Sequence, residues 1–198
     1  MANSKIIIVE GPQGVGKTTI TDFIRNTVPY TNLYRLSGTS DSSKSGKSKS
    51  IKMYDDLIEY IGKLQNMSIN LLFDRTFFTE EIYCRLGLKD YSFTDEYAKL
   101  IDRLSKMDFE IYYITLYLDD TEVYINRLKR SGKAVVKYSK FDKNNSINQQ
   151  EEYLKMADEI KENYPQINVH KVNSNKPLKE VEQEILDIIN NKKATNLK

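Results

Sequence analysis

Hydrophobic residues near the start of the chain change their spacing within a few turns of sequence. Residues 6–9 form a continuous β-branched run that ends at Glu10, Gly11 and Pro12, which is typical of a strand buried on both faces of a parallel sheet. From Lys17 the apolar positions recur at helical spacing, and Pro29 is expected to end that helix. The pattern predicts a strand, a glycine-containing loop and a helix.

The same alternation continues along the chain. Further strands are expected at residues 32–36, 69–73, 110–118 and 168–172, and further helices at 53–64, 79–86, 94–106, 121–131, 149–163 and 178–190. Strands that alternate with helices indicate a doubly wound α/β structure with a mostly parallel sheet. Because no repeat or domain boundary interrupts the pattern, we expect one domain over residues 1–198.

Two polar stretches and the end of the chain depart from this alternation. Residues 37–50 are almost entirely Ser, Lys and Gly, which bury too little apolar surface to offset the entropy of ordering, so a mobile loop is expected there. Residues 132–148 are also polar and rich in lysine, and residues 191–198 are expected to form a frayed tail.

Composition limits the classes of function. The 198 residues carry 30 Lys and Arg against 28 Asp and Glu, so a net charge of +2 does not favour a nucleic-acid-binding protein. Cys84 is the only cysteine, which excludes an intramolecular disulfide and suits a protein of the reducing cytoplasm. We expect its side chain to be a small, half-buried part of the core. The apolar run after the N-terminal residues is too short for a signal peptide or a membrane span, so we expect a protein in solution without a membrane partner.

A phosphate-binding signature lies between the first predicted strand and helix. Residues 11–18, Gly-Pro-Gln-Gly-Val-Gly-Lys-Thr, fit G-x-x-x-x-G-K-[ST] in the context that this motif requires. The glycines let the backbone curl until its N–H groups face phosphate oxygens, while Lys17 reaches the terminal phosphates and the Thr18 hydroxyl ligates magnesium. The sequence thus predicts ATP and Mg²⁺ as cofactors, bound by Gly11, Gln13, Gly14, Val15, Gly16, Lys17, Thr18 and Thr19.

A second Gly-Lys-Ser, at residues 46–48, does not complete the same signature. The first glycine of the motif would have to stand where Asp41 is, and no apolar strand precedes it. We interpret these residues as loop composition without a phosphate-binding role.

An acidic and a basic residue end the third predicted strand. Ligands of open parallel sheets collect at the carboxyl ends of the strands, so Asp74 and Arg75 are expected to face the same crevice as the phosphate loop. Asp74 can hold magnesium or act as a base, and Arg75 can grip an acceptor phosphate with two parallel hydrogen bonds. The alternative is an Asp that caps the strand beside a surface Arg.

Taken together, these motifs resemble the thymidylate kinase family of P-loop nucleoside monophosphate kinases over about residues 6–189. The similar segments are the phosphate loop with Glu10 before it, Asp74-Arg75-x-x-x-Thr79-x-x-x-Tyr83, Leu116-Tyr117-Leu118-Asp119 with Glu122-Val123 and residues 127–130, Glu152-Tyr153-Leu154, and the closing stretch from Asn168 to Ile188. The resemblance implies the P-loop kinase fold, with a five-stranded sheet, helices on both faces and a small lid, and a possible homodimer.

The resemblance also implies roles around the acceptor. Arg75 would contact the monophosphate, and Thr79 and Tyr83 would lie on a helix that lines the nucleoside. Phe77, Phe78 and Tyr83 offer flat apolar faces on which a base can stack. The alternative for these aromatic residues is that they fill the core.

Some residues depart from the family pattern. Gln13 stands where the family usually has a carboxylate that contacts the sugar, and residues 36–39 are a reduced form of its Glu-Pro-Gly-Gly-Thr segment. Gly14 excludes the loop arginine that some members carry. The identity of the base and of the sugar that the protein accepts therefore stays open. Residues outside the loop must stabilise the negative charge of the transition state.

A basic cluster follows the fourth predicted strand. Its members are Arg127, Lys129, Arg130, Lys133, Lys137 and Lys140. Charge alone favours a solvated face, but a kinase needs a lid that excludes water, and this position suits a lid at about residues 131–148. We expect Arg127 and Arg130 to supply charge to the transferring phosphoryl group.

The leading hypothesis is transfer of the ATP γ-phosphoryl group to a deoxynucleoside monophosphate, with dTMP first. A deoxynucleoside kinase is the next candidate, although residues 36–38 lack the carboxylate base that it usually needs. A regulatory NTP-binding module without turnover, and a polynucleotide kinase that uses Lys44, Lys47 and Lys49, are the remaining alternatives.

Overall fold

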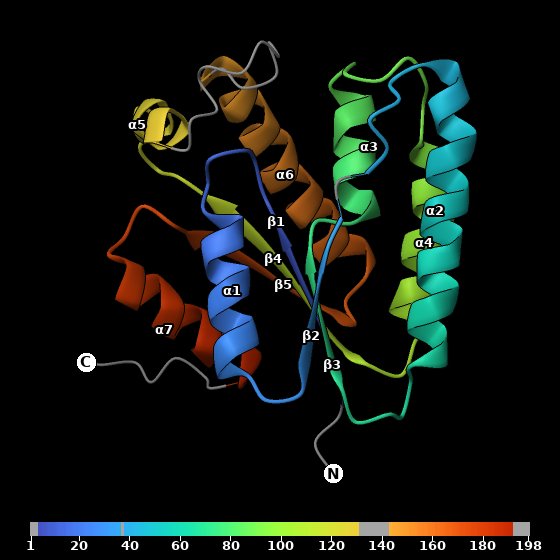
Figure 1. Ribbon diagram of the computed structural model, residues 1–198, viewed down its shortest axis with the longest axis horizontal. Helices are drawn as coiled ribbons and strands as arrows, with labels where there is room; N and C mark the ends of the chain where they lie inside the picture. The colour runs from blue at the N-terminus through green and yellow to red at the C-terminus, as the bar shows by residue number, and fades with distance from the viewer. Residues whose placement is uncertain (1–3, 37, 131–142, 192–198) are drawn as a thin grey trace.

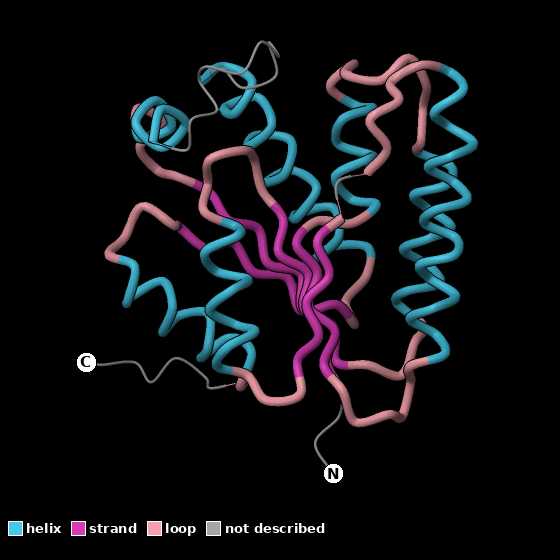
Figure 2. The backbone as a smooth tube through the Cα atoms, in the orientation of Figure 1, coloured by secondary structure: helices cyan, strands magenta, loops and turns pink. Residues whose placement is uncertain are grey.

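The computed structural model describes residues 4–36, 38–130 and 143–191. Its sheet has five parallel strands in the order β2-β3-β1-β4-β5 (Figure 2). They are β1 (Lys5–Glu10), β2 (Thr31–Arg35), β3 (Asn70–Asp74), β4 (Glu110–Tyr117) and β5 (Ile167–Asn173). The expected α/β class and the expected strands are confirmed, since each boundary lies within one or two residues of its prediction.

Helices cover both faces of this sheet (Figure 1). They are α1 (Lys17–Thr27), α2 (Lys44–Lys63), α3 (Phe77–Arg85), α4 (Thr94–Ser105), α5 (Val123–Arg130), α6 (Lys143–Asn163) and α7 (Leu178–Ile189). Side chains alternate between the faces of a strand, so Ile6 and Ile8 pack on one core with α2, α3, α4 and α6, while Ile7 and Val9 pack on the other with α1, α5 and α7. Cys84 is half-buried against the first core, as expected.

The expected mobile loop at residues 37–50 is wrong for its second half, because α2 begins at Lys44. The Asp41 carboxylate accepts hydrogen bonds from the Ser43 N–H at 3.0 Å, the Ser43 hydroxyl at 2.6 Å and the Ser45 hydroxyl at 2.9 Å. Gly46 is buried against the Asp41 backbone, where a side chain would clash. These local contacts stabilise a helix start that the polar composition does not reveal.

The lid expected at about residues 131–148 stays a prediction, but the helix expected at 149–163 begins earlier than its predicted start. Residues 131–142 lie outside the described part of the chain, and residues 143–148 belong to the first turns of α6. Gln150 helps to hold this part of α6 in place, because its side-chain oxygen accepts hydrogen bonds from the Leu118 N–H at 2.8 Å and from the Tyr124 hydroxyl at 2.6 Å. These bonds fasten the start of α6 to the end of β4.

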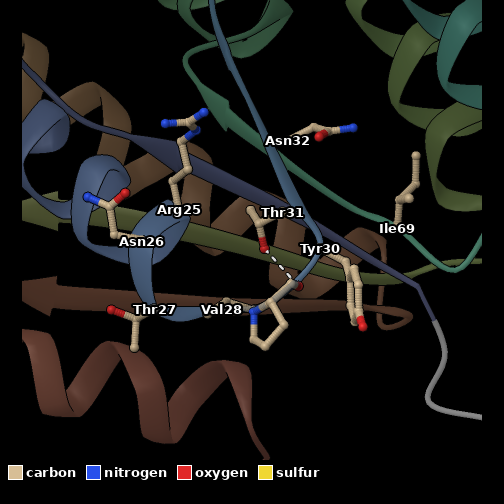
Figure 3. Close-up of a pocket in the computed structure, with 9 residues that line it drawn as sticks. Arg25, Asn26, Thr27, Val28, Tyr30, Thr31, Asn32 and Ile69 are labelled. Atoms are coloured by element: carbon tan, nitrogen blue, oxygen red, sulfur yellow. Dashed lines mark hydrogen bonds between the residues drawn. The ribbon is translucent and has the colours of Figure 1, made fainter.

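A hollow of about 620 Å³ lies at the end of the sheet where β2 and β3 begin (Figure 3). Its wall includes Arg25, Tyr30 and Ile69, and the Tyr30 ring is 82% exposed. It is therefore at the opposite end of the strands from the phosphate loop.

Candidate functional site

The phosphate loop joins β1 to α1 and needs its glycines for conformation and space. Gly11, Gly14 and Gly16 have φ values of 140°, 83° and 105°, which residues with a Cβ rarely adopt. A Cβ on Gly11 would also lie 2.6 Å from the Leu116 carbonyl oxygen. The backbone therefore curls as a phosphate-binding loop requires.

Lys17 lies inside this loop. Its ammonium group donates hydrogen bonds to the carbonyl oxygens of Gly11 at 2.6 Å and Pro12 at 2.7 Å, and the residue is only 6% exposed. Since α1 starts at Lys17, the positive end of the helix dipole adds to this charge. Backbone, helix and side chain together make the loop suitable for an anion.

Thr18 and Asp74 are brought together by neighbouring elements. The Thr18 hydroxyl donates to Asp74 Oδ2 at 3.3 Å, and the Arg35 guanidinium lies 3.7 Å from the same oxygen. A hydroxyl and a carboxylate are oxygen ligands that Mg²⁺ prefers when phosphates complete its coordination. Among residues 4–36, 38–130 and 143–191 there is no cluster of three His, Cys, Asp or Glu that could hold a metal.

Arg75 has an unusual backbone and a side chain that is available to a ligand. Its φ is 72°, and its guanidinium, which is partly exposed, makes no hydrogen bond or ion pair with any residue that the structure describes. Burial lowers the pKa of Arg75, but the oxygens of Tyr83, Tyr153 and Glu10 raise it, and the net pKa lies above its ordinary value. This guanidinium is a fixed positive charge beside the phosphate loop.

Glu10, which precedes the phosphate loop, is a buried residue to which the sequence motifs gave no role of its own. Its carboxylate is fully buried and accepts hydrogen bonds from the Thr76 N–H at 2.8 Å and the Thr79 hydroxyl at 2.7 Å. The Thr79 hydroxyl also contacts the Tyr153 hydroxyl at 2.7 Å. Burial raises the pKa of Glu10 to about 7, although these bonds and the charges of Arg75 and Lys17 lower it.

The raised pKa predicts how Glu10 affects stability. The folded protein holds the Glu10 proton up to about pH 7 and the unfolded chain only up to about 4.5, so the free energy of unfolding falls as the pH rises between these values. The loss for this one group is about 3 kcal/mol. Glu10→Gln is therefore expected to lose less stability than the wild type between pH 5 and pH 8 in urea denaturation. Equal losses in the two proteins would contradict the prediction.

The aromatic residues expected to stack on a base lie in the core. Phe77 and Phe78 are 1% and 0% exposed, and the Phe78 ring packs on Phe77 at 4.4 Å and on Tyr113 at 4.7 Å between centroids. Their faces are occupied by neighbouring rings, which corrects the expectation for Phe78. Tyr83 is partly buried against the same core.

Arg127 contacts the backbone of the phosphate loop and the end of β5. Its guanidinium donates to the Val15 carbonyl oxygen at 2.8 Å and to the Ser174 carbonyl oxygen at 2.7 Å, and the Ser174 hydroxyl donates to the same Val15 oxygen at 2.6 Å. The contact expected between Arg127 and the transferring phosphoryl group stays a prediction. The side chain of Arg130 and the lysines of residues 131–142 lie outside the described part of the chain.

Two serines that the sequence did not single out complete the support of the loop. Ser174 follows β5 directly, and the buried Ser146 of α6 donates its hydroxyl to the Gln13 carbonyl oxygen at 3.1 Å. The first turn of α6 therefore contacts the phosphate loop, while Tyr153, two turns later, contacts Thr79. The helix α6 therefore contacts both the phosphate loop and the hydrogen-bonded group around Glu10 and Thr79.

No protein-family model and no curated protein matches the sequence. Solved structures do match it at low identity. A thymidylate kinase from Candida albicans gives a TM-score of 0.64 at 16% identity over 96% of this chain and 93% of that one. A deoxyadenosine kinase from M. mycoides with dCMP and dCDP gives 0.55 at 19% identity over 95% and 100%. The YorR protein of Bacillus subtilis with phosphorylated GDP gives 0.62 at 19% identity over 93% and 95%.

The chain therefore has the fold of the P-loop kinases, and its structural neighbours include thymidylate kinases, as the sequence motifs suggested. In the part of the chain that the structure describes, no helix is both long and apolar enough to cross a membrane.

Proposed function

We propose that this protein transfers the γ-phosphoryl group of ATP to a deoxynucleoside monophosphate, with dTMP as the leading acceptor. The observation that carries the proposal is the Arg75 guanidinium, which makes no hydrogen bond or ion pair with any described residue and lies where β3 ends beside the phosphate loop. A fixed, unpaired guanidinium suits a second phosphate group, which an acceptor monophosphate supplies.

The residues of the site divide the work of an in-line transfer. The loop amides and Lys17 hold the β- and γ-phosphates, and Arg75 holds the acceptor phosphate so that its oxygen faces the γ-phosphorus. Thr18 and Asp74 are the residues that would hold Mg²⁺, which when bound neutralises charge on the phosphates. Transfer then depends on positioning and charge, with no covalent intermediate on the protein. Residues of the lid region, among them Arg130, are proposed to close over the phosphates.

A deoxynucleoside kinase remains the second candidate because of one side chain. Glu80 of α3 lies against the loop after β2, with Oε2 3.0 Å from the position that a Cβ on Gly38 would take. Its other oxygen accepts from the Ser50 hydroxyl at 3.1 Å and pairs with Lys89 at 3.1 Å. A carboxylate from α3 is thus present beside Gly38, although residues 36–38 supply none themselves, and a nucleoside hydroxyl needs such a base.

The first experiment is an ADP-release assay with magnesium and ATP against a panel of deoxynucleoside monophosphates and free deoxynucleosides. We expect turnover with a monophosphate, and highest turnover with dTMP. Turnover with free nucleosides alone would overturn the proposal in favour of the second candidate. ATP binding without turnover on any acceptor would favour a regulatory NTP-binding module.

The same preparation tests the remaining proposals. Light scattering checks the homodimer that the family resemblance implies. We also propose a cytoplasmic protein whose substrates are small nucleotides, and it should therefore show no salt-dependent binding to single-stranded DNA.

A further inference from the structure

Glu10 is a buried carboxylate inside the proposed transfer site that no step of the proposed reaction uses. It follows Val9 in β1, and Val9 lies opposite Asp74 in β3. Continuing the parallel register by one residue places Glu10 beside Arg75. Glu10, the last residue of β1, therefore lies next to Arg75, whose guanidinium is proposed to bind the acceptor phosphate.

Both peptide groups that flank Arg75 are held by the end of β1. The Arg75 N–H donates to the Val9 carbonyl oxygen at 3.3 Å, and the Thr76 N–H donates to Glu10 Oε1 at 2.8 Å. The φ of 72° between them is disfavoured for arginine and persists only where the surroundings fix it. Because Val9 fixes one peptide and Glu10 the other, these two residues set the direction in which the Arg75 side chain points.

The carboxylate that holds this turn is itself held at its second oxygen. Glu10 Oε2 accepts from the Thr79 hydroxyl at 2.7 Å, and that hydroxyl contacts Tyr153 of α6 at 2.7 Å. The charges of Arg75 and Lys17 act on Glu10, whose surroundings also include the buried hydroxyl of Tyr113. Fixed at both oxygens, the carboxylate cannot rotate away from Thr76.

We propose that Glu10 is a positioning residue for acceptor recognition, which acts by holding the Arg75 backbone so that the guanidinium faces the acceptor phosphate. This inference rests on the proposed function. It assigns a role to a residue that no step of the proposed reaction uses, and it predicts that the effect of changing Glu10 passes through Arg75.

Steady-state kinetics of Glu10→Ala and Glu10→Gln, with ATP and the best monophosphate from the panel, test the proposal. Glu10→Ala is expected to raise the acceptor KM roughly tenfold, the effect of one lost buried hydrogen bond, and to leave the ATP KM unchanged. Glu10→Gln is expected to raise it less, because its amide oxygen still accepts from Thr76. In an Arg75→Ala background, Glu10→Ala should have no further effect on kcat/KM for the acceptor.

The matched control is Glu81→Gln on α3. Glu81 is also a buried carboxylate, but it pairs with Arg85 at 2.8 Å and accepts from Thr94 at 3.0 Å, away from Arg75. Its acceptor KM should equal that of the wild type. An unchanged acceptor KM in Glu10→Ala, or additive losses in the double variant, would overturn the inference while the proposed function stands. Absence of turnover by the wild type on every monophosphate would overturn both.

Discussion

Lys17→Ala is expected to lower kcat by roughly 10²- to 10³-fold, the loss that follows removal of one preorganised charge from a transition state. The ammonium group lies inside the phosphate loop, 2.6 Å from the Gly11 carbonyl oxygen, where a triphosphate would replace the loop carbonyls as its partner. Charge moves onto the β- and γ-phosphates as the phosphoryl group transfers, so the lost interaction is stronger in the transition state than in the ground state.

The folding stability of Lys17→Ala should change much less than its turnover. Lys17→Ala loses the hydrogen bonds to the Gly11 and Pro12 carbonyl oxygens, and we expect this to cost about 1 to 2 kcal/mol in urea denaturation. Lys47→Ala is the matched control, because Lys47 belongs to the second Gly-Lys-Ser and lies on α2. Its turnover should equal that of the wild type. An unchanged kcat in Lys17→Ala would remove the loop from the mechanism.

The sequence predicted the elements whose signals are local. Residues 6–9 form an apolar run because β1 is covered on both faces, and the spacing of Gly11, Gly16 and Lys17 identifies the loop without knowledge of its neighbours. The start of α2 could not be predicted in this way, because a composition rich in Ser, Lys and Gly favours a mobile loop over a helix. A single carboxylate, Asp41, organises that turn through hydrogen bonds that composition does not encode.

The contacts that complete the site join residues far apart in the chain. Glu10 and Thr79 are 69 residues apart, Gln13 and Ser146 are 133 apart, and Val15 and Ser174 are 159 apart. Neither periodicity nor spacing carries information about such pairs. The same limit explains Phe78: it lies just before the expected helix at 79–86, and helical spacing alone does not show that its ring faces the core instead of a ligand.

This long-range network gives α6 a place in the proposed mechanism. Its first turn contacts the phosphate loop through Ser146, and Tyr153 contacts Thr79, the partner of Glu10. A shift of α6 would therefore move groups on the donor and acceptor sides together.

Arg75→Ala is expected to lower kcat/KM for the acceptor monophosphate by roughly 10²- to 10³-fold, because a charge-assisted, two-bond contact to phosphate is lost in a water-poor crevice. The KM for ATP should stay unchanged, since the triphosphate is held by the loop and Lys17. Stability should fall only slightly, because the guanidinium makes no hydrogen bond or ion pair with any residue that the structure describes, and the variant loses only its attraction to groups such as Glu10 and Asp74.

Arg75→Lys separates charge from geometry at the same position. Lysine keeps the positive charge but lacks the planar fork that matches two phosphate oxygens, so it should recover only a small part of the lost kcat/KM. Full recovery would mean that charge alone suffices, and the fixed backbone of Arg75 would then lose its purpose. A wild-type acceptor KM in Arg75→Ala would place the acceptor phosphate elsewhere and would contradict the central contact of the proposed reaction, whatever the turnover of the wild type.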